Sequence, residues 1–152
     1  MGSANAVGRV VVDSAVQLHR ELGPGLLESV YEATLAEELK SRNLSVERQV
    51  SVPLTYRGLR FEQGFRIDLY VERTVIVEIK STDRLEDAHR KQLLTYLRLT
   101  DTPLGFLLNF GMSTMRAGIV RMVNNLQEEF LLGVPWRTSR LCENPYKRVV
   151  TP

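Results

Sequence analysis

Apolar residues recur at intervals of three and four along residues 6–42, and this spacing predicts two helices. The first is expected over residues 6–22 and the second over residues 26–42, where Asn43 ends it. Between them Gly23, Pro24 and Gly25 favour a turn, because proline interrupts a helix and glycine relaxes the backbone. The positions expected to face the core are Val12, Ala15, Val16, Leu18 and Leu22 in the first helix, and Leu27, Val30, Leu35 and Leu39 in the second.

From residue 46 the apolar residues recur every second position, which predicts strands. Residues 46–52 alternate until Pro53 interrupts them, and residues 56–59 are typical of a turn. Residues 65–71 and 75–80 alternate again, and the three-residue link 72–74 joins them as a hairpin. A loop of this length pairs Val71 with Val75, which places Asp68 opposite Glu78.

The remainder of the chain returns to a helical spacing and then loses its pattern. A helix is expected over residues 85–99, a buried strand over 105–110 and an edge strand over 115–123. The helix is expected to bury Leu85, Leu93, Leu94 and Leu97. Residues 126–132 favour one or two helical turns, and residues from 133 onward are predicted to be irregular. The chain thus reads as an α/β domain over residues 1–125 with a partly irregular C-terminal extension over residues 126–152.

Composition excludes several classes of protein. The 152 residues suffice for one domain with a core, and 43% hydrophobic and 25% charged residues are ordinary globular usage. No apolar run approaches the roughly 20 residues of a membrane helix, and no signal-peptide pattern begins the chain. Cys142 is the single cysteine, which excludes an intrachain disulfide and a cysteine-ligated zinc site. A reducing cytoplasm is the expected location.

Charge is unevenly distributed along the chain. Residues 1–111 carry 14 Lys and Arg against 15 Asp and Glu, a balance of −1, whereas residues 112–152 carry six against three. The basic end is compatible with a polyanionic partner without demonstrating one. The near-neutral body argues against a strong, self-sufficient grip on nucleic acid, because such affinity comes mostly from neutralising phosphates.

Three polar side chains of the predicted hairpin carry its candidate chemistry. Glu78 and Lys80 are two residues apart on one strand and therefore share a face, which Asp68 joins from the facing strand. Two carboxylates and an amine suit a magnesium or manganese site that acts on a phosphate. The alternative is that Asp68, Glu78 and Lys80 form the solvated face of a two-sided sheet, with pairing of Glu and Lys across strands for stability alone.

Several short motifs together resemble one nuclease family. Ile67-Asp68 followed by Glu78-Ile79-Lys80 resembles the PD-(D/E)xK superfamily, and the segment from Gln92 to Tyr96 is similar to the QxxxY motif of RecB-type and phage-type exonucleases. The segment from Gly25 to Tyr31 matches the signature of the GxxExxY protein family, a branch of that superfamily. The resemblance covers about residues 6–125. It implies a restriction-endonuclease-like core, in which helices flank a central mixed sheet.

The resemblance also implies roles for individual residues. Asp68 and Glu78 would bind a metal ion, and Glu28 on an early helix would complete its site. Lys80 would assist catalysis, and Gln92 and Tyr96 would lie near the substrate backbone or the catalytic lysine. The implied cofactor is Mg²⁺, with Mn²⁺ as an alternative.

Two functions from different classes follow. The first is a metal-dependent nuclease that hydrolyses phosphodiester bonds of DNA or RNA. The second is a non-catalytic module on the same fold that binds nucleic acid or protein. A homodimer or a protein partner is compatible with either, and a membrane partner is not expected. His19 is a further candidate metal ligand, with an interhelical hydrogen bond as its commoner role.

Overall fold

The structure, a computed structural model, describes residues 3–125. The predictions for the C-terminal extension lie outside the described residues. The elements in chain order are α1 (Ala4–Leu22), α2 (Glu28–Ser41), β1 (Val46–Tyr56), β2 (Leu59–Val71), β3 (Val75–Lys80), α3 (Asp87–Leu99), β4 (Leu104–Asn109), α4 (Met115–Gly118) and β5 (Ile119–Val123). No helix among these residues is long and apolar enough to cross a bilayer.

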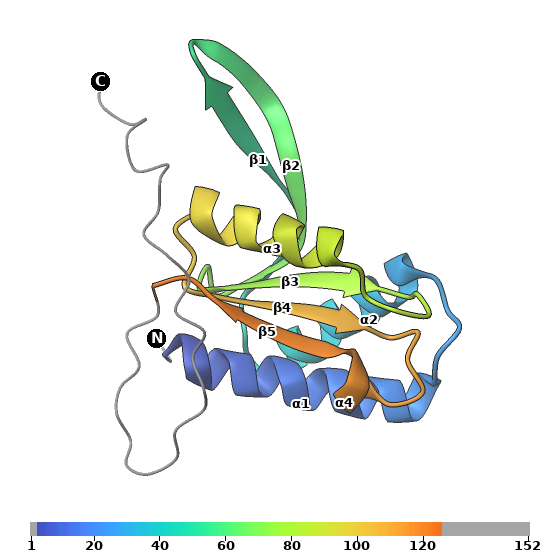
Figure 1. Ribbon diagram of the computed structural model, residues 1–152. Coiled ribbons are helices and arrows are strands. Elements are labelled where there is room, and N and C mark those ends of the chain that lie inside the picture. Colours follow the sequence, from blue (N-terminus) through green and yellow to red (C-terminus); the bar gives the residue numbers. More distant parts are fainter. Residues whose placement is uncertain (1–2, 126–152) are drawn as a thin grey trace.

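A mixed five-stranded sheet forms the centre of the molecule, with its strands in the order of the chain (Figure 1). The pairs β1–β2, β2–β3 and β4–β5 are antiparallel. The pair β3–β4 is parallel, as a connection through α3 requires. Helices α1 and α2 pack on one face of the sheet and α3 on the other. This confirms the predicted α/β class with a mixed sheet between helices.

Each face of the sheet has its own apolar core. The α1/α2 core joins residues of those helices, such as Val11 and Leu35, to Leu69, Val77 and Leu108 of the sheet. The α3 core joins Leu93, Tyr96 and Leu97 of α3 to Ile67, Tyr70, Ile76 and Leu107. Strand β4 is buried along its entire length because it lies between the two cores. Its continuous apolar sequence fits such a strand.

The structure corrects the predicted start of two helices. Helix α2 begins at Glu28, after Leu27 as an extended N-cap residue, and not at residue 26. Leu27 and Val30 are therefore 74% and 39% exposed, although the helical spacing placed both on the buried stripe. Leu22 of α1 is also exposed, at 41%. Helix α3 begins at Asp87 and not at residue 85, because Glu86 and His89 form a capping box there.

Two strand predictions are also corrected. Strand β1 continues through Pro53 to Tyr56, with an irregular register between Val52 and Leu54, so the β1–β2 hairpin is much longer than predicted. We call its residues 54–61 the arm, which projects beyond the rest of the sheet (Figure 1). Residues 115–123 are a short helix followed by a strand and not one edge strand. Gly118 ends that helix against the Asn109 carbonyl, where a Cβ would lie only 2.2 Å away.

In the β1–β2 hairpin, alternate residues change from one face of the sheet to the other at one position, which the alternating pattern did not predict. Ile67 packs in the α3 core, whereas Leu69, two residues later, packs in the α1/α2 core. Strand β1 changes sides at the same level, because Val46 packs against the α1/α2 core and Val50 against the α3 core. Residues at alternate positions of a regular strand share a face. The two strands therefore twist sharply between these residues, at Asp68.

Candidate active site

The β2–β3 hairpin pairs Val71 with Val75 and Leu69 with Val77, as the loop length predicts. Asp68 and Glu78 would be the next pair, but the main-chain pairing stops before them. The Asp68 side chain instead accepts a hydrogen bond from the Ile79 amide, at 2.9 Å to Oδ2. The Asp68 carboxylate thus takes the place of a main-chain partner, and the amide of Ile79, the residue after Glu78, binds it.

Glu78 is buried beside Lys80. Its side chain is 2% exposed, and Lys80 Nζ lies 3.6 Å from Glu78 Oε2. Within residues 3–125, Glu78 Oε1 is buried without a hydrogen-bond partner. The alternative of a solvated sheet face is therefore wrong for Glu78. A buried carboxylate oxygen without a partner is costly, and such atoms concentrate at functional sites.

Burial sets the electrostatics of the two carboxylates. It raises the pKa of Glu78 to about 8, with a further contribution from the Asp68 charge that the nearby Lys80 ammonium only partly offsets. Burial also raises the pKa of Asp68, against the hydrogen bond from Ile79 and the Lys80 charge. Two carboxyls that disfavour ionisation together can share a proton or be neutralised by a cation.

Helix α3 covers the site with a tyrosine. The Gln92 amide nitrogen donates a hydrogen bond to the Tyr96 hydroxyl. The Tyr96 ring stacks on Phe65 of β2, with centroids 4.2 Å apart. Burial raises the pKa of Tyr96, and the charges of Glu78 and Asp68 raise it further. Both α3 residues of the predicted site therefore lie near the carboxylate pair, and their roles stay predictions.

Glu28 lies at the rim of the cluster and not inside it. Its Oε1 accepts a hydrogen bond from the Ser81 amide at 3.1 Å, directly after Lys80. Its charge contributes to the raised pKa of Asp68, so the two are near each other. Among residues 3–125, however, no three His, Cys, Asp or Glu side chains converge as a ready-made metal site. The structure thus brings Asp68, Glu78 and Lys80 together. Glu28 lies at the edge of this cluster, where it binds Ser81, the residue after Lys80.

The tyrosine of the Gly25–Tyr31 motif holds the loop that leads to Glu28. Tyr31 is fully buried and stacks on Phe110 at 4.3 Å between centroids. Its hydroxyl donates to the Gly23 carbonyl at 2.6 Å and accepts from the Leu26 amide at 3.2 Å. Ser81 Oγ donates to the Leu26 carbonyl at 2.8 Å. The motif therefore couples the start of α2 to the end of β3.

Asn109 couples the end of β4 to Thr82, which follows the end of β3. It is fully buried, and its Oδ1 accepts hydrogen bonds from the amides of Thr82 and Gly111 while its Nδ2 donates to the Thr82 carbonyl. Gly111 is required there, because a Cβ would lie 2.5 Å from the Thr82 carbonyl oxygen. His19 lies in this region too. Its Nε2 contacts the Met112 carbonyl oxygen at 2.9 Å, so the hydrogen bond joins α1 to the loop before α4 and not to another helix.

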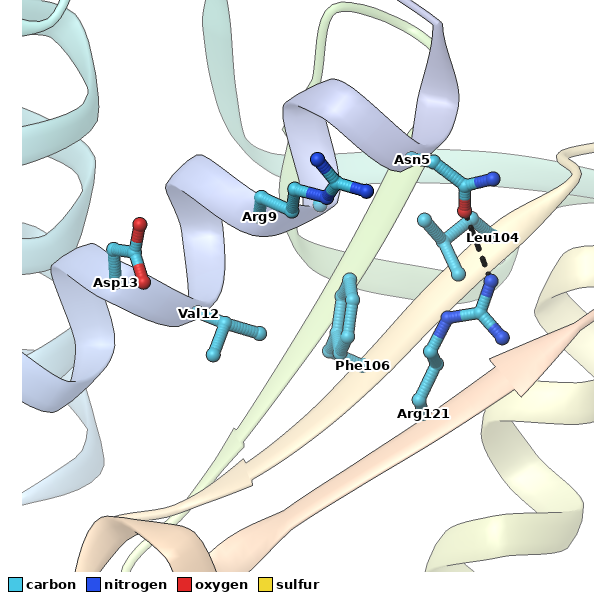
Figure 2. Close-up of a pocket in the computed structure, with 8 residues that line it drawn as sticks. Asn5, Arg9, Val12, Asp13, Leu104, Phe106 and Arg121 are labelled. Atoms are coloured by element: carbon cyan, nitrogen blue, oxygen red, sulfur yellow. Dashed lines mark hydrogen bonds between the residues drawn. The ribbon is translucent and has the colours of Figure 1, made fainter. Parts of the chain in front are cut away.

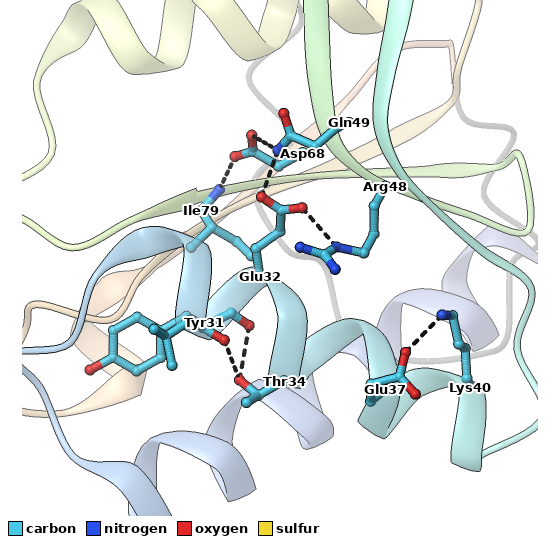
Figure 3. A network of polar contacts seen from close by, with 10 residues as sticks. Tyr31, Glu32, Thr34, Glu37, Lys40, Arg48, Gln49, Asp68 and Ile79 are labelled. Atoms are coloured by element: carbon cyan, nitrogen blue, oxygen red, sulfur yellow. Dashed lines mark hydrogen bonds and ion pairs between the residues drawn. The ribbon is translucent and has the colours of Figure 1, made fainter.

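A polar network on the other side of Asp68 was missed by sequence reasoning (Figure 3). Glu32 of α2 is 6% exposed and accepts hydrogen bonds from Arg48 Nε at 2.9 Å and Gln49 Nε2 at 2.6 Å. Gln49 Nε2 also lies 3.4 Å from Asp68 Oδ1. Arg48 and Gln49 lie far from the known motifs in the sequence, whereas Glu32 directly follows the motif residue Tyr31 and was the one available signal.

Two cavities of the described residues lie away from this cluster. One of about 370 Å³ lies between α1 and the β4–β5 strands (Figure 2). Arg121 donates to Asn5 Oδ1 at 2.9 Å across its mouth. None of the predicted site residues lines this cavity, whose walls are formed by Asn5, Gly8, Arg9, Val12, Asp13, Leu104, Phe106 and Arg121. The candidate site instead lies where Asp68 of β2 and Glu78 of β3 are level with each other, under the Tyr96 side chain of α3.

The centre of the molecule is thus a mixed sheet between helices that carries an aspartate, a glutamate and a lysine close together on its β2–β3 hairpin. A family model of the PD-(D/E)XK nuclease superfamily matches residues 5–122, and the chain belongs to that superfamily. No curated protein and no solved structure matches the chain. The superfamily implies nucleic acid as the partner and divalent metal ions as the usual cofactors. The closer assignment to the GxxExxY family stays a prediction.

Proposed function

We propose that this protein hydrolyses phosphodiester bonds of nucleic acid with the help of a divalent metal ion. The observation that carries the proposal is the state of Glu78. It is buried, one of its oxygens has no partner among the described residues, and a second carboxylate and a lysine lie beside it. A carboxylate kept in this setting for stability alone would be poorly chosen, because an apolar residue would fill the space at lower cost.

The donor set fits a hard divalent cation. Asp68 and Glu78 would hold the ion through carboxylate oxygens, the ligands that Mg²⁺ and Mn²⁺ prefer. Glu28, at the rim, would hold it through a water or after a small movement of its exposed side chain. A bound ion supplies a Lewis acid for the phosphate and lowers the pKa of a bound water.

The remaining residues act on the substrate. Lys80 presents an ammonium beside the carboxylates, where it would neutralise negative charge that develops on the phosphate. Burial and the two carboxylates favour the protonated hydroxyl of Tyr96, which suits it to donate a hydrogen bond to a phosphate oxygen. Gln92 fixes the direction of that hydroxyl. None of these groups selects a base, so the proposal extends to DNA and RNA alike.

The test is an unbiased substrate panel. Single- and double-stranded DNA and RNA, linear and circular, are incubated with Mg²⁺, with Mn²⁺ and with a chelator. Cleavage that requires the metal and is lost in Asp68→Asn is the expected result. Binding of nucleic acid by both parent and variant, without cleavage of any substrate under either metal, would contradict the proposal and support the non-catalytic module.

A further inference from the structure

Gln49 joins two carboxylates that would otherwise repel each other. Its Nε2 lies 2.6 Å from Glu32 Oε2 and 3.4 Å from Asp68 Oδ1 (Figure 3). A carboxamide nitrogen carries two hydrogens, one for each acceptor. Since both neighbours are acceptors, this orientation of the amide is the one that satisfies them. Gln49 is neutral, so it binds both carboxylates without adding a charge.

The backbone of β1 is distorted at Gln49, and this distortion directs the Gln49 side chain toward the two carboxylates. Gln49 has a φ of 53°, in the left-handed region, in the middle of β1. The pairs on either side, Arg48 with Leu69 and Val50 with Ile67, are in register, whereas Gln49 and Asp68 do not pair. A side-chain-bearing residue rarely adopts such a φ, and the distortion persists only where its surroundings hold it. Strand irregularities of this kind re-aim side chains beside active sites.

Glu32 holds the far end of Gln49. It is 6% exposed, and Arg48 Nε binds its second oxygen at 2.9 Å. The chain of contacts therefore runs from the body of α2 through Gln49 to Asp68, whose other oxygen is bound by the Ile79 amide. Both oxygens of Asp68 are thus oriented by neighbours.

We propose that Gln49 is a positioning residue, which Glu32 holds and which fixes the Asp68 carboxylate in the orientation that accepts a hydrogen bond from the Ile79 amide. The inference deepens the proposed function and rests on it, because the orientation of Asp68 matters most if Asp68 holds a metal ion. Partners that orient a metal ligand are typically worth 10- to 100-fold in metal affinity or activity. Glu32 acts through Gln49 and touches neither Glu78 nor Lys80 in the contacts of the described chain.

The test compares two variants with a matched control. Gln49→Asn keeps the carboxamide and tolerates a left-handed φ, but is one methylene too short to reach both carboxylates. Gln49→Leu keeps the size and removes the donors. Gln63→Leu makes the same change at an exposed glutamine of the same hairpin. Folding is checked by circular dichroism, so that a variant that fails to fold is recognised and Gln49→Asn decides.

The first readout needs neither metal nor substrate. The exchange rate and chemical shift of the Ile79 amide proton, measured by NMR, report whether Asp68 still accepts its hydrogen bond. We expect exchange at least about tenfold faster in both Gln49 variants and unchanged in Gln63→Leu. The second readout is titration with Mn²⁺, in which affinity falls about tenfold or more in the Gln49 variants.

The outcomes separate the two proposals. An unchanged Ile79 amide and unchanged Mn²⁺ affinity in folded Gln49→Asn would overturn the positioning role, whatever the parent cleaves. A parent that binds no metal and cleaves nothing, with an Ile79 amide that still responds to both variants, would overturn the proposed function and leave the positioning role standing.

Discussion

The buried carboxyl of Glu78 links the stability of the protein to pH. Its pKa is about 8 in the folded chain against an ordinary value of 4.5. Below about pH 4.5 both states hold the proton. Between these values the unfolded chain releases it while the folded chain keeps it, so the free energy of unfolding falls as pH rises and stays low above pH 8. The raised pKa of Asp68 acts in the same direction.

Glu78→Gln is expected to remove much of this slope. The variant should match the parent near pH 4.5 and exceed its stability at pH 8 to 9, because the amide has no proton to lose. The measurement is urea unfolding across this range with a chelator present. Glu62→Gln is the control, since Glu62 is 73% exposed and pairs with Arg60. Parallel pH profiles for the parent and Glu78→Gln would show that Glu78 titrates normally.

Truncation of Lys80 and truncation of Glu78 should have different effects on cleavage and on metal binding. Lys80→Ala removes no metal ligand, so we expect cleavage to fall by about 10²- to 10³-fold while metal binding stays or tightens slightly. Glu78→Ala should weaken metal binding directly. Calorimetric titration with Mn²⁺ beside a cleavage assay separates the two. Lys91→Ala, an exposed lysine of α3, is the control. Full turnover by Lys80→Ala would make Lys80 only a pairing partner of Glu78.

At the scale of elements, the Tyr31 hydroxyl holds the loop between α1 and α2. Tyr31→Phe keeps the stacking on Phe110 and leaves the Gly23 carbonyl and the Leu26 amide without this partner. We expect a loss of about 1–3 kcal/mol in the free energy of unfolding. Metal affinity should fall as well, because the loop leads directly to Glu28.

The control for this prediction is Tyr56→Phe on the arm, where the side chain is 59% exposed. Its stability should stay within about 0.5 kcal/mol of the parent. Urea unfolding and Mn²⁺ titration are measured on both variants. If Tyr31→Phe behaves like Tyr56→Phe, the loop is held by packing alone and the motif tyrosine has another purpose.

Local rules sufficed for the hairpin and the first helix. The period of two and the three-residue loop predicted the pairing of Val71 with Val75, because strand geometry and loop length fix register without help from the rest of the chain. The same parity predicted that Glu78 and Lys80 would meet. The α/β class followed from the change of period along the chain.

Long-range contacts decided the rest. The start of α2 depends on the hydrogen bond from the Tyr31 hydroxyl to the Gly23 carbonyl. The spacing of Leu27 and Val30 therefore wrongly predicted that both would be buried. The change of face at Asp68 depends on the left-handed backbone of Gln49, which no local pattern in residues 46–52 signals. Gly118 ended the last helix against a carbonyl that belongs to β4.

At the scale of the whole molecule, the arm should be far less protected than the sheet. Residues 55–61 of the arm are all exposed, whereas every residue of β4 is buried. We expect arm amides to exchange with solvent by local opening, and β4 amides only by global unfolding. Hydrogen exchange followed by mass spectrometry measures both. Equal protection of the arm and β4 would indicate that the arm is covered in an assembly, as a homodimer would cover it.

The order of the sheet has a consequence for how the protein is made. Because the strands lie in chain order, each strand that leaves the ribosome finds its neighbour already synthesised. Helix α1, by contrast, packs against a strand that is synthesised much later. Its Gly8 packs against Leu104 and Phe106 of β4, about a hundred residues later. At typical translation rates that interval lasts on the order of ten seconds, during which the apolar stripe of α1 is available to chaperones.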